Sequence, residues 1–277
     1  MPSKSNLYID NKGVIMASLT AERRNRIAKI LLSEGSIKVG DMAELFDVST
    51  ETIRKDIIYL EQKGLAEKSF GGAIAKTSLV EKPLNERALV QAEAKAAIAR
   101  QAVELIPDGA TILIDAGSTT NAIANQLILR QGLTIITNSL ELANILANAK
   151  SDVFLCGGYI RRSSHALVGG WTLERLQHIH ADIAFLGSDG FHGQSGPTCM
   201  SYDESTVKSF MLRAASQTYV VADATKSQHS AQFAYADWHD VTGLITAGEQ
   251  LDKLKSLLRD QTKIIAAPPL TTQAPLE

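Results

Sequence analysis

Apolar residues near the start of the chain recur at the spacing of amphipathic helices. The pattern predicts three helices in succession, over residues 20–33, 39–46 and 49–63. In the third of them, Ile53, Ile57 and Leu60 follow one another at i, i+4 and i+7, so one stripe of the helix faces a core. Ser49 at its start is a good N-cap, and a short hairpin with glycines at its turn is predicted over residues 65–74.

The polar face of the third helix is suited to reading DNA. A short, rigid helix with an apolar back and a cation-bearing polar front can enter the major groove. We expect four of its residues to contact base edges: Thr50, Glu51, Arg54 and Lys55. We expect a second group to contact phosphates: Ser49, Thr52, Arg24 and, in the hairpin, Lys68. The pattern alone leaves open a small helical domain with an ordinary charged face.

Beyond residue 90, short apolar runs alternate with helical segments. After an alanine-rich helix over 91–106, strands are expected at 110–115, 133–137, 152–156, 182–187, 218–223, 241–246 and 262–266. The helices expected between them cover 119–130, 139–149, 203–215 and 249–259. Alternating units of this length predict an α/β domain with a mainly parallel sheet and helices on its faces.

The patterns together predict two domains: a winged helix-turn-helix, mainly α with a small β wing, and then the α/β domain. We expect a flexible arm at 1–18, the first domain at 19–75, a linker at 76–90, the second domain at 91–267 and a disordered tail at 268–277.

The composition is that of an ordinary globular protein, with 277 residues, 45% hydrophobic and 21% charged. The two cysteines, Cys156 and Cys199, are too few for a disulfide framework or a zinc site. Since long apolar runs and a signal-peptide pattern are absent, we expect a cytoplasmic location and no membrane partner. The net charge of −2 argues weakly against nucleic acid, so phosphate contacts would depend on local basic clusters.

Residues 20–75 resemble the DNA-binding domain of DeoR-type bacterial repressors. The resemblance is carried by the run STETIRKDI that begins at Ser49, by the wing glycines Gly71 and Gly72, and by Glu22 and the two arginines that follow it. It implies sequence-specific binding to a double-stranded DNA operator. Because one recognition helix reads few base pairs, we also expect a homo-oligomer, either a dimer or a tetramer.

Loops rich in glycine and hydroxyl groups follow several of the expected strands. The loop DAGSTT, which begins at Asp115, opens a helix whose free N–H groups can bind an anion together with the hydroxyls of Ser118, Thr119 and Thr120. A simple capped turn is the alternative at this loop.

Charged and amide side chains lie in further loops at the same expected edge of the sheet. Ligands of open parallel sheets sit at the carboxyl ends of the strands. We therefore expect Arg161 and Lys226 to face a phosphate, and Asp115, Asn138 and Asp189 to face sugar hydroxyls. Each charge taken alone could be an ordinary solvated loop residue.

Residues 77–266 resemble the sensor domain of the same family, which in turn is similar to the ribose-5-phosphate isomerase fold. The resemblance implies a phosphorylated sugar or sugar alcohol as effector. The loops and the resemblance together give the candidate ligand-binding residues: Asp115, Gly117, Ser118, Thr119, Thr120, Asn138, Ser139, Gly158, Arg161, Asp189, Glu204 and Lys226.

These features favour a transcriptional regulator, a repressor of a carbohydrate-utilisation operon that the effector relieves. We expect no catalytic residues, no metal and no cofactor. The alternative is a sugar-phosphate isomerase with an appended DNA-binding module, with Glu204 among its candidate bases. The isomerases carry an acidic pair after their Asp-Gly, whereas Phe191 and His192 follow Gly190 here, which argues against turnover. A DNA-binding scaffold with a vestigial sensor fold is a third possibility.

Overall fold

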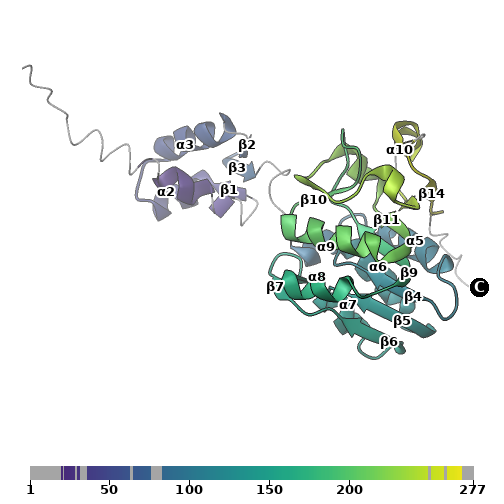
Figure 1. Cartoon of the computed structure of the whole chain (residues 1–277). Helices are drawn as coiled ribbons and strands as arrows, with labels where there is room; N and C mark the ends of the chain where they lie inside the picture. The colour runs from purple at the N-terminus through teal and green to yellow at the C-terminus, as the bar shows by residue number, and fades with distance from the viewer. Residues whose placement is uncertain are drawn as a thin grey trace, which may run out of the picture. The chain divides into compact units, whose positions relative to one another are not determined.

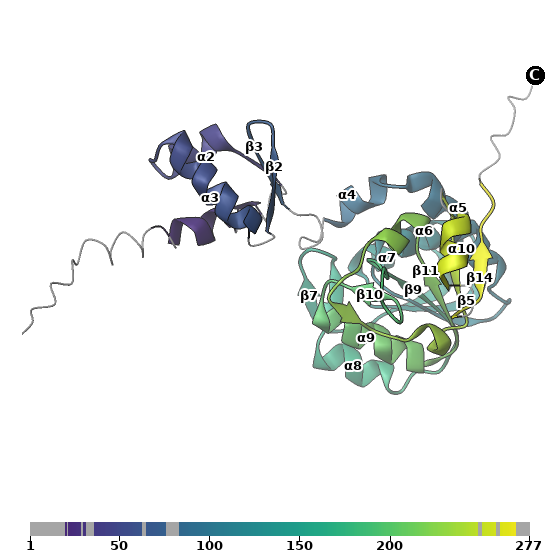
Figure 2. The same ribbon diagram turned by 90° about the horizontal axis from the view of Figure 1, so that it is seen from above.

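The computed structural model describes residues 20, 22–28, 30–31, 36–62, 65–75, 83–248, 251–258 and 261–269. The chain divides into two units, residues 1–81 and 82–277, and each is described by itself (Figures 1 and 2). The expected arm, residues 76–82 of the expected linker and the tail from residue 270 onward lie outside the described residues.

The first unit combines helices with a small antiparallel sheet. Its described residues between 20 and 31 are helical. They are followed by β1 (Ser36–Lys38), α2 (Val39–Leu45), α3 (Thr50–Gln62), β2 (Ala66–Ser69) and β3 (Gly72–Ala75). The strands pair in the order β1-β3-β2. The three predicted helices and the wing hairpin are confirmed, while the predicted end of the third helix, at residues 63 and 64, lies outside the described residues.

Strand β1 is missing from the sequence prediction. Its three residues contain a single apolar side chain, Ile37, so no alternation marks it as a strand. It pairs with β3 where a Cβ on Gly72 would lie 2.0 Å from the carbonyl oxygen of Ile37. Glycine is therefore required at position 72 for the third strand of the wing to form.

A buried carboxylate ties the first helix to α3. Asp56 is 1% exposed and lies between the core residues Ile53 and Ile57. Its two oxygens accept hydrogen bonds from Nε of Arg23 at 2.7 Å and from Nε of Arg24 at 2.8 Å. A buried carboxylate must be paired to be tolerated, so these two arginines fix the position of α3.

Seven of the described strands of the second unit form one sheet, in the order β14-β13-β11-β9-β4-β5-β6, and every neighbouring pair in it is parallel. The strands are β4 (Thr111–Ile114), β5 (Gln131–Thr137), β6 (Lys150–Leu155), β9 (Ala181–Gly187), β11 (Ala215–Val221), β13 (Gly243–Thr246) and β14 (Ile264–Ala266). The predicted fold class, an α/β domain with a mainly parallel sheet after a winged helix-turn-helix, is confirmed.

Helices cover both faces of this sheet (Figure 1). They are α4 (Leu84–Leu89), α5 (Ala92–Glu104), α6 (Ser118–Leu127), α7 (Leu140–Ile145), α8 (Gly170–Leu176), α9 (Tyr202–Arg213) and α10 (Leu251–Leu258). Along β4, Ile112 and Ile114 pack with α5, α6 and α7, whereas Leu113 packs on the other face with α8 and α9. This alternation explains why a central strand such as β4 is almost continuously apolar.

Several short elements depart from the sequence prediction. Part of the expected linker forms α4, which packs against α6. The hairpin of β7 (Tyr159–Arg161) and β8 (Ala166–Val168), the helix α8, and the small sheet of β10 (Thr198–Cys199) and β12 (Phe233–Ala234) were not predicted. Elements of two to seven residues carry too little periodicity to be recognised.

The buried pairing of Asp56 generates a stability prediction for the first unit. Replacing Asp56 by Asn leaves two arginines facing a neutral group, and we expect a loss of about 2–4 kcal/mol. Hydrogen exchange measures the effect: the amides of α3 should exchange faster while those of β4 do not change. Glu51→Gln is the matched control, because Glu51 forms an exposed pair with Arg54 whose loss costs about 0.5 kcal/mol or less. Equal protection of α3 in Asp56→Asn and wild type would contradict the prediction.

Candidate functional site

Helix α3 presents a polar surface to solvent. The residues predicted to contact bases are all exposed: Thr50, Glu51, Arg54 and Lys55. Ser49 caps the helix as predicted, since its Oγ accepts a hydrogen bond from the backbone N–H of Thr52 at 3.2 Å. Arg54 and Glu51 lie 3.5 Å apart as an exposed pair one turn apart. Such a pair is weak, so the guanidinium can exchange its carboxylate partner for a base edge.

Two of the predicted phosphate contacts have partners within the protein. Arg24 pairs with Asp56, and its guanidinium lies 4.1 Å from the ring centroid of Tyr59. Lys68 lies 3.0 Å from Glu61, and this hydrogen bond lowers the pKa of the Glu61 carboxyl. The pairing gives Arg24 a structural role, and contact of either residue with DNA stays a prediction.

The second site begins where the strand order of the sheet reverses, between β4 and β9. Asp115 follows β4 and is 1% exposed. Both of its carboxylate oxygens accept from the backbone N–H of Gly187 at 3.1 Å, and its Oδ2 accepts from the ammonium of Lys208 on α9. The same ammonium donates to the carbonyl of Gly187 at 3.0 Å. A buried ion pair therefore joins the two central strands at the place where open α/β sheets bind ligands.

Three other predicted ligand residues are also buried and engaged inside the protein. Asn138 accepts from the N–H of Ala116 and donates to the carbonyl of Leu167, both at 3.1 Å. Ser139 caps α7, and the hydroxyl of Thr120 donates to the carbonyl of Gly117 at 2.9 Å. These bonds shape the loops, and direct contact of these residues with a ligand stays a prediction.

The start of α6 offers backbone N–H groups to an anion. Gly117 occupies the N-cap position and supplies no side chain to bind them. Ser118 is half-exposed there, whereas Thr119 is buried. Unpaired N–H groups at a helix start favour a negative charge, so this turn fits the predicted anion contact.

The remaining charged candidates lie on different elements: Asp189 follows β9, Lys226 lies in a short 3₁₀ turn after β11, Arg161 ends β7 and Glu204 lies on α9. Arg161 lies 3.5 Å from the buried Glu204, and Asp189 lies 3.5 Å from Arg87 of α4. Lys226 is half-exposed and, within the described part of the chain, its ammonium makes no hydrogen bond or ion pair. Gly158 packs against Thr172, where a Cβ would lie 2.3 Å from Thr172 Oγ1.

A cluster of cations is the most unusual feature of this edge. Lys95 of α5 is 5% exposed, and its ammonium donates to the carbonyls of Arg87 and Val90. The pKa of Lys95 is lowered to about 8, mainly because the side chain is buried; the carboxylate of Asp223 acts in the opposite direction, and the positive charges of Lys226 and Arg87 contribute to the lowering. Two further cations therefore act on the buried ammonium of Lys95, and the carboxylate of Asp223 also acts on it, while Asp189 pairs with Arg87.

Three members of the site are absent from the sequence prediction. Arg87 falls in the expected linker and Lys208 in the helix expected at 203–215, and neither was assigned a role. Lys95 lies in the alanine-rich helix, one position from the buried Ala94 and three from the buried Ile98. A lysine inside an apolar stripe is the signal that could have identified it, because such a residue is rarely buried without a partner.

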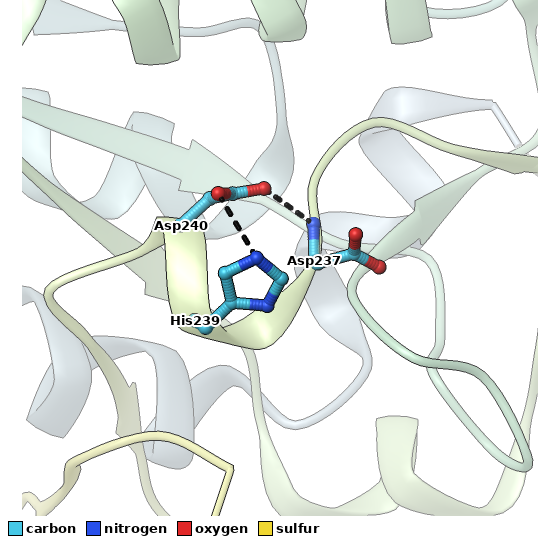
Figure 3. A group of neighbouring side chains, drawn as sticks. All are labelled: Asp237, His239 and Asp240. Carbon is cyan, nitrogen blue, oxygen red and sulfur yellow. Dashed lines mark hydrogen bonds and ion pairs between the residues drawn. The ribbon is translucent and has the colours of Figure 1, made fainter.

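One group of possible metal ligands occurs among the described residues. Asp237, His239 and Asp240 are exposed side chains of a short 3₁₀ turn (Figure 3). The carboxylate of Asp240 accepts from the N–H of Asp237, and Asp237 accepts from the hydroxyl of Ser195. These hydrogen bonds cap the turn, which explains why the three side chains lie close together.

Comparison with known proteins matches both units. The family model described as "DeoR-like helix-turn-helix domain" covers residues 23–79, and that described as "DeoR C terminal sensor domain" covers residues 90–247. The chain belongs to the DeoR family of DNA-binding transcriptional regulators. Among the described residues, no helix is long and apolar enough to cross a bilayer.

Curated relatives match over most of their length. The transcriptional repressor CsqR of Escherichia coli K12 is 32% identical over 88% of this chain and 94% of its own. The glycerol-3-phosphate regulon repressor of the same strain is 32% identical over 74% of this chain and 82% of its own. The regulator GlpR of Haloferax volcanii is 32% identical over 83% of this chain and 91% of its own. These relatives are regulators, and the expectation that this DeoR-family chain is not an enzyme is confirmed.

Solved structures give weaker similarities. Ribose 5-phosphate isomerase A of Methanocaldococcus jannaschii has a TM-score of 0.36 at 20% identity, with 48% of this chain and 52% of that chain covered. The sorbitol operon regulator SorC of Klebsiella pneumoniae has a TM-score of 0.39 at 10% identity, with 84% and 98% covered. TM-scores this low support no functional conclusion.

The exposed pair on α3 generates a prediction about base reading. If Arg54 contacts a base edge, Arg54→Ala should weaken operator binding by about 1–3 kcal/mol and random DNA much less. Lys68→Ala should weaken both kinds of DNA alike and reduce the salt slope by about one. Fluorescence anisotropy with both DNAs measures the difference, and Arg213→Ala in the second unit is the control. An equal loss on operator and random DNA in Arg54→Ala would assign Arg54 to the backbone instead.

Proposed function

We propose that the protein represses a carbohydrate-utilisation operon and leaves its operator when a phosphorylated sugar or sugar alcohol binds the second unit. The observation that carries the proposal is the cationic cluster of Arg87, Lys95 and Lys226. The cluster lies at the edge where ligands of such sheets bind, and it holds more positive charge than the carboxylates beside it balance.

The chemistry of the cluster favours a phosphate over a neutral sugar. A buried ammonium with a lowered pKa is destabilised in its charged form by its surroundings. A phosphate dianion placed among three cations relieves that repulsion and accepts several charge-assisted hydrogen bonds. The uncapped start of α6 adds N–H donors to the same anion. The names of relatives agree with this class of ligand, since one is the glycerol-3-phosphate regulon repressor.

The two ends of the ligand would then meet different parts of the site. The phosphate binds the cations, and the sugar hydroxyls face Asp189 and the pair that Arg161 of β7 forms with Glu204 of α9. In this arrangement Asp115 and Lys208 hold β4 and β9 together beneath the ligand.

The position of Arg87 suggests how effector binding in the second unit changes the affinity of the first unit for DNA. Arg87 belongs to α4, the first described helix after the first unit ends at residue 81. An effector that draws Arg87 toward its phosphate acts on the segment that joins the two units. The effector releases the operator to the extent that it binds the free form more tightly than the DNA-bound form.

The proposal predicts a phosphate-dependent release from DNA. Operator binding should weaken on addition of a phosphorylated metabolite, such as glycerol 3-phosphate or a hexose phosphate, and should not respond to the same compound without its phosphate. Lys226→Ala should bind the operator normally in the absence of effector and lose the response. Lys150→Ala is the matched control, because Lys150 is exposed at the opposite end of β6.

Anisotropy titration of labelled DNA from the region upstream of the gene checks these outcomes. If no phosphorylated metabolite of a broad panel changes operator affinity or thermal stability, the second unit does not act as a sensor. A normal response in Lys226→Ala would remove Lys226 from the site.

The lowered pKa of Lys95 predicts the pH dependence of effector binding. In the free protein Lys95 loses its proton near pH 8, and a bound phosphate favours the protonated form. Above about pH 8 binding must therefore take up a proton, and affinity should fall by up to about tenfold per pH unit. The phosphate itself is fully ionised in this range because its second pKa is about 6.

Isothermal titration calorimetry between about pH 7 and about pH 9 measures this effect. Lys95→Met should bind more weakly and without the pH dependence. A wild-type affinity that stays constant across this range would show that the phosphate does not meet Lys95.

A further inference from the structure

An apolar face is exposed around the Gly157–Gly158 loop of the second unit. Four aromatic side chains lie on it: Phe154, Tyr159, Trp171 and Tyr202. Three aliphatic side chains accompany them: Leu140, Leu155 and Ile160. We call these seven residues the aromatic face.

Contacts around the loop link the elements that carry these residues. The loop joins Leu155 at the end of β6 to Tyr159 at the start of β7. On α8, the residue after Trp171 donates its hydroxyl to the carbonyl of Gly157 at 2.6 Å. The hydroxyl of Tyr159 donates to the carboxylate of Asp203, the neighbour of Tyr202.

Backbone contacts extend the same surface to α7 and the hairpin. The N–H of Leu140 donates to the carbonyl of His165 in the turn of the β7–β8 hairpin, at 3.1 Å. Ile160 lies on the same hairpin, paired with Leu167. Both views place β7 and α8 side by side (Figures 1 and 2).

The exposed area of the aromatic face is large for a monomer. Trp171 is 75% exposed and Tyr202 is 67% exposed, and Phe154 and Tyr159 are each more than half exposed. At 150–250 Å² per aromatic side chain, the four rings expose roughly 500 Å². A stable protein interface buries about 800 Å² on each partner, so the rings with the three aliphatic side chains come close to what a dimer needs.

The composition of the face is also that of an interface core. Tyrosine, tryptophan and phenylalanine are enriched at such cores, and lysine and glutamate are depleted. The face includes the outer edge of the sheet, because β6 is the terminal strand next to β5. Its unpaired backbone groups would otherwise invite uncontrolled pairing with other chains.

We propose that the aromatic face is the surface through which a second copy of this chain binds by two-fold symmetry. In such an interface the same patch serves both partners, and an aromatic patch can pack against its own copy. A regulator with one recognition helix per chain needs a second copy to read a two-fold symmetric site. The inference stands apart from the proposed effector, since it concerns assembly without DNA or ligand.

Self-association of the full chain tests the proposal. Sedimentation equilibrium should find the wild type associated as a dimer or a multiple of it. Trp171→Glu and Phe154→Glu should each weaken association by about 30-fold or more, since they place a charge at the centre of the interface. Leu129→Glu is the matched control, because Leu129 is 80% exposed outside the face, and it should associate as the wild type does.

Tryptophan fluorescence measures the same association without a charge introduced into the aromatic face. With Trp238→Phe removing the buried tryptophan, the emission of Trp171 should shift to longer wavelength as the protein is diluted through its dissociation range. A monomeric wild type, or wild-type association in both glutamate variants, would overturn the proposal. So would Trp171 emission that does not change on dilution while the oligomer dissociates.

Discussion

A buried ammonium among other cations is the constraint on which the second unit depends. Lys95 is held inside the protein by the carbonyls of Arg87 and Val90, and burial lowers its pKa to about 8. Charges of one sign placed together in a poorly hydrated site are unfavourable, and groups with shifted pKa values concentrate at functional sites. An anion that enters the cluster removes the repulsion, so the free domain already carries part of the energy that favours binding.

The first unit also contains a buried charge, and this charge is paired within the unit. The carboxylate of Asp56 lies in the core of the helical domain and is neutralised by Arg23 and Arg24 from the first helix. The pairing fixes α3 from behind and leaves its outer face to the weakly paired Arg54. The first unit therefore satisfies its buried charge within the chain, and we propose that a ligand balances the cation cluster of the second unit.

The sequence predicts the elements whose periodicity is long, and the features that it misses depend on contacts between distant residues. The helix that contains Ile53, Ile57 and Leu60 and the buried strands of the sheet were predicted because each carries a clear repeat. The partnership of Asp115 with Lys208 spans 93 positions, and no local pattern reveals it. Arg87 was hidden in an expected linker, and Lys95 in an alanine-rich helix, because their roles arise only when α4, α5 and the loop of Lys226 come together.

A crystal structure of the full chain with an inducing sugar phosphate would test the central claim most directly. The account predicts phosphate oxygens within hydrogen-bonding distance of Lys95, Lys226 and Arg87, beside the first turn of α6. A bound inducer whose phosphate lies elsewhere, with these three cations arranged as in the free protein, would contradict it.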